Sequence, residues 1–217
     1  MNRREFISYM DYTLLTPTAT KERIKSFCEE AIAFGFNTVF VNPYYASYAR
    51  FLLHAHEIKV GIPVGFSLGG AVTSVKVEEA KQGIKDGAQE LDMLMNLSAF
   101  KSKEFDVVKR DIQEVVHVAN GLTTKVIIET ALLTKEEKIL ATVLIIESGA
   151  DFVKTSTGFN GGATIDDVRL LRSIAKDDIG IKAAGGIKTY HDAIQMIKAG
   201  ASRIGSSNAI ALVREEV

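Results

Sequence analysis

Short apolar segments alternate with longer amphipathic segments along this chain, and that rhythm constrains the fold more than any other feature. Most of the short segments are near-continuous apolar runs, which are typical of parallel strands buried on both faces. They fall at residues 12–15, 38–41, 60–66, 90–95, 125–129, 151–154, 179–183 and 202–204. Between them, apolar residues recur at helical spacing, as in Ile24, Phe27, Cys28, Ala31 and Ile32.

Capping residues and glycines mark the ends of the predicted helices. Thr134 and Glu137 form a capping-box sequence, and similar pairs with Asp begin at Thr164 and Thr189. Glycine accepts the left-handed backbone that ends many helices. Four helical patterns end in this way just before a predicted strand, at Gly35, Gly87, Gly149 and Gly200. This repeated joint, a helix followed by glycine and then a strand, favours one repeated strand–helix unit over a mixed fold.

Eight strands with helices between them in 217 residues predict an α/β fold, the (β/α)8 TIM barrel. No Pro-, Ser- or Gly-rich linker interrupts the chain, so residues 1–217 are expected to form a single domain. An open doubly wound sheet is the alternative. Its usual G-x-G-x-x-G turn after the first strand is missing, because Leu14-Leu15-Thr16-Pro17 stands there.

Composition and charge exclude several classes of protein. The chain has 26 Lys and Arg against 27 Asp and Glu, so no bulk attraction to nucleic acid or to an anionic membrane is expected. With 47% hydrophobic residues it is not intrinsically disordered, and no apolar run approaches the length of about 18 residues that spans a bilayer. Its one cysteine, Cys28, excludes an internal disulfide framework, and a cytoplasmic location is expected.

Two lysines occupy matching places at the ends of successive predicted strands. Lys154 ends the segment 151–154, and Lys182 lies in the segment 179–183. In a barrel these strand ends form the active-site face. Neighbouring strands lie about 4.8 Å apart, so two ammonium groups there would repel each other. The pair makes sense if one lysine is neutral and acts as an amine nucleophile that forms a Schiff base with a carbonyl. Each lysine alone could equally reach water or a carboxylate.

Asp92 lies within the apolar segment 90–95 and shares a face with Glu90 and Leu94 by alternation. An acid inside an apolar strand needs partners. It could hold a lysine in a salt bridge, or it could shuttle protons between substrate and amine. The two roles are compatible.

Glycine-rich turns follow the last three predicted strands: Gly158-Phe159-Asn160-Gly161-Gly162, Gly185-Gly186 and Gly205-Ser206-Ser207. Their backbone N–H groups could bind a phosphate, a task that often falls to the last loops of a barrel. Ordinary turns also need glycine, so the phosphate-binding hypothesis depends on the three turns together.

The histidines and the cysteine are not expected to form a site. The pair His54 and His56 does not share a helix face, so no metal site is expected there, and Cys28 is expected to pack in the core.

These segments resemble deoxyribose-phosphate aldolases, a class I, Schiff-base aldolase family with a (β/α)8 barrel. The resemblance covers nearly the whole chain, and the Lys-Thr-Ser-Thr-Gly sequence that begins at Lys154 is its most specific part. The matching segments are 11–15 (DYTLL), 41–43 (VNP), 65–69 (GFSLG), 90–93 (ELDM), 125–130 (KVIIET), 152–159 (FVKTSTGF), 182–187 (KAAGGI) and 203–207 (RIGSS).

The resemblance implies reversible cleavage of 2-deoxy-D-ribose 5-phosphate to D-glyceraldehyde 3-phosphate and acetaldehyde. Lys154 matches the Schiff-base lysine, Lys182 the second lysine that lowers its neighbour's pKa and moves protons, and Asp92 the acid of the proton relay. The phosphate-binding positions are matched by Gly158, Gly185, Gly186, Ser206 and Ser207. The family uses no metal or organic cofactor. The expected partners are a phosphorylated sugar and aldehydes, and the expected assembly is a homo-oligomer, a dimer or a tetramer.

Three residues depart from the family pattern. Tyr12 stands where many members have histidine, Phe40 where many have cysteine, and Ser67 where proline is usual. None touches the catalytic matches, so the departures bear on substrate-side details such as aldehyde preference. The rival functions are a phosphosugar isomerase or epimerase, and a non-catalytic phosphosugar-binding barrel.

Overall fold

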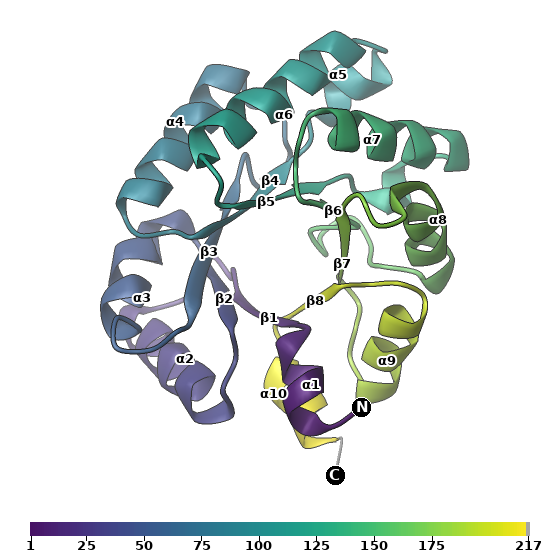
Figure 1. Cartoon of the computed structure of the whole chain (residues 1–217). Helices are drawn as coiled ribbons and strands as arrows, with labels where there is room; N and C mark the ends of the chain where they lie inside the picture. The colour runs from purple at the N-terminus through teal and green to yellow at the C-terminus, as the bar shows by residue number, and fades with distance from the viewer. Residues whose placement is uncertain (216–217) are drawn as a thin grey trace.

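In the computed structural model, which describes residues 1–215, eight parallel strands close into a barrel surrounded by helices (Figure 1). Each strand pairs with the next in sequence, and β8 pairs with β1. The strands are β1 (Met10–Leu14), β2 (Thr38–Val41), β3 (Lys59–Val64), β4 (Glu90–Leu94), β5 (Thr123–Ile127), β6 (Phe152–Lys154), β7 (Gly180–Ala184) and β8 (Arg203–Ser206). The predicted barrel is confirmed, and the open doubly wound sheet is excluded by the closing β1–β8 pair.

The helices form an outer ring, with α1 and α10 side by side near the two ends of the chain (Figure 1). Their bounds are α1 (Arg3–Ser8), α2 (Lys21–Phe34), α3 (Ala46–Leu52), α4 (Thr73–Lys85), α5 (Leu97–Lys101), α6 (Phe105–Ala119), α7 (Lys135–Glu147), α8 (Ile165–Ala175), α9 (Tyr190–Lys198) and α10 (Ala209–Arg214). Two 3₁₀ turns, η1 (Pro43–Tyr45) and η2 (Thr130–Leu132), follow β2 and β5.

The predicted helix signals are mostly confirmed. Capping boxes form at Thr134 with Glu137 and at Thr189 with Asp192, whereas Thr164 caps α8 from its own side chain only. All four joint glycines take a left-handed backbone. The strand ends shift by up to two residues. For example, β3 stops at Val64 because Gly65 turns the chain with a φ of +66°.

The inner face of the barrel is charged rather than aliphatic. The apolar residues of the strands that point outward, such as Val39, Leu91 and Ile181, are fully buried against the helices. The inward positions include Asp11, Glu90, Asp92, Lys125 and Lys182, each at most 1% exposed. The runs are therefore buried on both faces, as expected, but the inner face requires charges that neutralise one another.

Glycines inside the barrel make room for large inward side chains. Gly61 of β3 is the register partner of Phe40 on β2, and a Cβ at this glycine would overlap the Phe40 ring. Gly180 of β7 stands in the same relation to Phe152 of β6. Small residues beside large ones let the interior reach close packing without displacing the charged groups.

We predict that Gly61→Ala lowers the free energy of unfolding by about 1–3 kcal/mol, because the added methyl group overpacks the barrel against Phe40. Urea denaturation measures the loss. Gly70→Ala is the matched control, since a Cβ there has nothing within 4 Å. Phe40→Leu in the Gly61→Ala background should recover part of the loss. An unchanged stability for Gly61→Ala would contradict the packing argument.

Candidate active site

A cavity of about 430 Å³ opens at the carboxyl ends of the strands. Lys154 is the only titratable side chain among the described residues that line it. The lining residues come from five loops and strand ends: 13–17, Phe66, Lys154 with 157–159, 184–187 and 205–207. The structure therefore brings the strand-end lysine and the three glycine-rich turns into one cavity.

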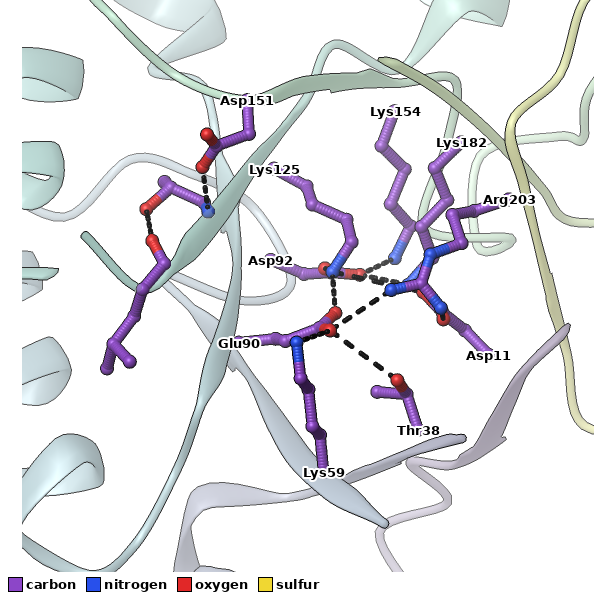
Figure 2. A network of polar contacts seen from close by, with 12 residues as sticks. Asp11, Thr38, Lys59, Glu90, Asp92, Lys125, Asp151, Lys154, Lys182 and Arg203 are labelled. Atoms are coloured by element: carbon purple, nitrogen blue, oxygen red, sulfur yellow. Dashed lines mark hydrogen bonds and ion pairs between the residues drawn. The ribbon is translucent and has the colours of Figure 1, made fainter. Parts of the chain in front are cut away.

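Lys154 and Lys182 are direct register partners on neighbouring strands. Both Nζ atoms donate to the same atom, Asp92 Oδ2, each at 2.7 Å (Figure 2). Lys182 and Asp92 do not line the cavity but lie beneath it, each 1% exposed. Asp92 thus holds both lysines, which is the salt-bridge role expected of it from the sequence.

Burial lowers the pKa of Lys154 from its usual value near 10.5 to about 8, against the opposing pull of Asp92 and with the help of Lys182. The sequence argument put repulsion by Lys182 first. Its direction is right, but loss of water is the larger cause. At pH 7.5 about a quarter of lysines with such a pKa are neutral, against about one in a thousand with a pKa near 10.4. Lys154 is therefore a usable amine near neutral pH.

Burial alone would raise the pKa of Asp92, but Lys154, Lys182 and Lys125 together lower it well below its usual range. Asp92 is accordingly an ionised carboxylate when the cavity is empty of substrate. It can pass a proton only after receiving one from a neighbouring ammonium group. The geometry provides that donor, since Lys182 and Lys154 share its Oδ2 atom.

Four more charged residues extend this group down the barrel, and the sequence analysis did not assign them a role. Lys182 also forms an ion pair with Asp11 Oδ2 at 2.7 Å. Arg203 donates to Asp11 at 3.0 Å and to Glu90 at 3.1 Å, and Lys125 contacts Glu90 and lies 3.4 Å from Asp92 Oδ1. Alternation already placed Glu90 on the face of Asp92. The same test applied to every strand indicates which face the others occupy, but not which of them meet.

The sequence analysis also missed Glu129, a buried residue that holds a loop of the cavity wall. Its Oε1 accepts a hydrogen bond from the backbone N–H of Thr157, in the loop that follows Lys154. The side chain is 1% exposed, and its backbone is left-handed with a φ of +52°. Glu129 therefore anchors the cavity wall formed by Thr157 and Gly158. Only its place at the end of the predicted strand 125–129 hinted at this.

The predicted phosphate-binding residues lie together in the cavity wall: Gly158, Gly185, Gly186, Ser206 and Ser207. The turns after β6 and β7 pack directly against each other. A Cβ at Gly185 would lie 3.1 Å from Gly158 Cα and 3.0 Å from Gly162 Cα. This close approach of two backbones requires glycine at position 185.

The three departures from the family pattern lie away from the cavity wall. The Tyr12 hydroxyl donates to Glu30 at 2.6 Å, behind the barrel wall. Phe40 lies inside the barrel, with its ring centroid 3.7 Å from Lys182 Nζ. Ser67 is in the loop after β3, and only its neighbour Phe66 lines the cavity. Phe40 therefore contacts Lys182, so the expectation that no departure touches the catalytic matches is wrong for this residue.

The remaining candidates lie outside this site. Cys28 is buried in α2, and burial raises the pKa of its thiol to about 12. Within residues 1–215, no group of three or more His, Cys, Asp or Glu side chains is arranged to hold a metal ion. No helix in that range is both long and apolar enough to cross a membrane.

Comparison with known proteins identifies the family to which this chain belongs. Residues 6–211 match a family model described as DeoC/LacD family aldolase. Deoxyribose-phosphate aldolase 2 of Oceanobacillus iheyensis is 59% identical over 217 residues, covering all of this chain and 97% of that protein. The deoxyribose-phosphate aldolase of Thermococcus kodakarensis is 53% identical, over 98% of this chain and 97% of that protein. A tetrameric deoxyribose phosphate aldolase from Aeropyrum pernix superposes with a TM-score of 0.93 at 34% identity, over 98% and 91% of the two chains.

Proposed function

We propose that this chain, which belongs to the DeoC/LacD family of aldolases, catalyses the reversible cleavage of 2-deoxy-D-ribose 5-phosphate to D-glyceraldehyde 3-phosphate and acetaldehyde. One observation carries the proposal. Lys154, with a pKa lowered to about 8, shares a single cavity with three glycine-rich turns. The names of the full-length relatives from Oceanobacillus iheyensis and Thermococcus kodakarensis support this substrate.

The neutral amine of Lys154 attacks C1 of the open-chain sugar, and loss of water gives a protonated imine. The C2–C3 bond then breaks as the proton of the C3 hydroxyl leaves. The bonding electrons move toward the iminium nitrogen, which leaves an enamine on Lys154 and releases D-glyceraldehyde 3-phosphate. Protonation of the enamine carbon and hydrolysis of the imine release acetaldehyde and regenerate the amine.

Asp92 and Lys182 are placed to move the protons of these steps. Asp92 Oδ2 contacts both lysine nitrogens, so a proton from Lys182 can reach the nitrogen of Lys154 or the departing water through this carboxylate. The same contacts fix the direction of the Lys154 side chain. We assign Lys154, Asp92 and Lys182 as the catalytic residues on this basis.

The wall formed by Gly158, Gly185, Gly186, Ser206 and Ser207 would bind the substrate phosphate. Glycine lets backbone N–H groups approach the anion closely, and the two serine hydroxyls can donate as well. No carboxylate lines the cavity within the described residues, so nothing there repels the phosphate. Among the described residues, the lining also lacks the Glu and His groups on which an isomerase or epimerase of this type relies, which makes that alternative less favourable.

We further propose a homo-oligomer, because the Aeropyrum pernix aldolase is tetrameric and barrels of this kind commonly pair. The choice between a dimer and a tetramer, and the cytoplasmic location expected from the single cysteine, stay predictions.

Acetaldehyde with borohydride should attach one ethyl group per chain, on Lys154, because only an imine is reduced to a stable adduct. Intact-mass and peptide mass spectrometry locate the label, and EDTA in the reaction checks that no metal is needed. Lys154→Arg is the matched control: it keeps a charged side chain but cannot form the imine, and both label and aldolase activity should disappear. Labelling mainly at another lysine, with Lys154→Arg still active, would overturn the assignment.

Gly186→Asp should raise KM for 2-deoxyribose 5-phosphate by at least about tenfold more than for unphosphorylated 2-deoxyribose, because a carboxylate would repel the phosphate. A Cβ fits there, with its nearest neighbour, Gly162 Cα, at 3.9 Å, but the φ of +75° strains any side chain. Gly186→Asn is therefore the control, since it has the same shape and strain without the charge. If Asp and Asn variants affect both substrates alike, this turn does not hold the phosphate.

A further inference from the structure

Beneath the cavity, the barrel encloses a cluster of six charged side chains (Figure 2). Its members are Asp11, Glu90, Asp92, Lys125, Lys182 and Arg203, contributed by β1, β4, β5, β7 and β8. The first five are at most 1% exposed, and the Arg203 side chain is 17% exposed. Lys154 meets this cluster from above through Asp92. The reaction proposed above uses only Asp92 and Lys182, so the other members have no assigned task.

The charges of the cluster sum to zero without Lys154. Three carboxylates face three cations, and each cation lies within 4 Å of at least two of the carboxylates. If Lys154 is an ammonium ion, the buried group carries one uncompensated positive charge. Net charge is costly in an interior of low dielectric constant, so the neutral cluster favours the amine form of Lys154.

The remaining elements around the cluster add little charge. β2 contributes Thr38 and Phe40, and β6 contributes Phe152 beside Lys154 itself; the Phe40 ring lies 4.7 Å from Lys125 Nζ. β3 contributes Lys59, which lies 3.7 Å from Glu90 but has a side chain 51% exposed. Water screens Lys59, so its charge weighs much less on Lys154 than those inside.

We propose that the charge sum of this whole cluster, and not Lys182 alone, keeps Lys154 in its amine form, and that Lys125 and Glu90 set this sum from outside the cavity. The proposal rests on the proposed function only in taking the Lys154 amine as the reacting group. Lys125 and Glu90 are positioning residues in this account: they contact each other and do not line the cavity. Lys125 and Glu90 carry opposite charges. Removing the charge of Lys125 leaves the cluster with a net negative charge, and removing that of Glu90 leaves it with a net positive charge.

Removing the positive charge in Lys125→Met should shift the titration of Lys154 to higher pH by about one to two units. Lys125 lies within 4 Å of Asp92, the carboxylate that binds Lys154, and without Lys125 that carboxylate stabilises the ammonium form of Lys154 more strongly. Glu90→Gln should shift it to lower pH by up to about one unit, because an unbalanced positive charge remains. The double variant removes one charge of each sign and should return the titration to within about half a unit of the parent. If the two substitutions acted by damaging the packing, their effects would instead add up in the double variant.

The readout is the pH dependence of labelling of Lys154 by a trace of acetic anhydride, quantified on its peptide by mass spectrometry. Only the amine form reacts, and the measurement needs no aldolase activity. Lys76→Met is the matched control: Lys76 is fully buried and paired with Asp111 between α4 and α6, outside the barrel. It should lower stability, as judged by urea denaturation, without moving the titration of Lys154.

Shifts of Lys125→Met and Glu90→Gln in the same direction, or no shift in either, would overturn the proposal. If Lys125→Met does not fold, Glu90→Gln decides alone, because glutamine keeps the shape that accepts from Thr38 and Arg203. A shift to lower pH supports the proposal, and no shift or a shift to higher pH refutes it. Failure of the proposed function has a different signature: borohydride trapping on Lys154 would then fail in the parent protein, whatever the labelling titration gives.

Discussion

One oxygen atom, Asp92 Oδ2, accepts hydrogen bonds from both Lys154 and Lys182 at 2.7 Å. In water such a contact would simply keep both lysines charged. Inside the barrel, loss of hydration works against the ammonium form of Lys154, while Asp92 favours it. A pKa of about 8 is the result of this opposition. The chemistry of the site depends on keeping the carboxylate, the two amines and their surroundings dry.

The interior and the rim of the barrel meet that requirement in different ways. The interior supplies carboxylates and cations from five strands, and Gly61 and Gly180 make room for the aromatic rings of Phe40 and Phe152 beside them. The rim supplies backbone turns without carboxylates around a cavity in which Lys154 is the only titratable lining side chain among the described residues. An anionic substrate can therefore approach the amine without meeting the charges that control it.

The sequence was enough to predict the barrel, because its strands and helices have local signals: apolar runs, capping residues and joint glycines. It also identified Lys154 and Lys182, because equivalent positions on successive strands become neighbours in any parallel barrel. The roles of Asp11, Lys125 and Arg203 could not be predicted in the same way. Alternation says which face a side chain occupies, but the stagger between distant strands decides which inward side chains meet. Arg203 and Asp11, for example, are joined only where β8 closes on β1.

The protonation state of Lys154 in the free protein is the most direct test of this account. A ¹³C NMR titration of the lysine Cε resonances measures it, with Lys154→Arg identifying the signal by its loss. The account predicts that the Lys154 resonance titrates with a midpoint near pH 8. A Lys154 resonance that stays in the ammonium form up to pH 10 would contradict it, because burial and the surrounding charges would then not produce a usable amine.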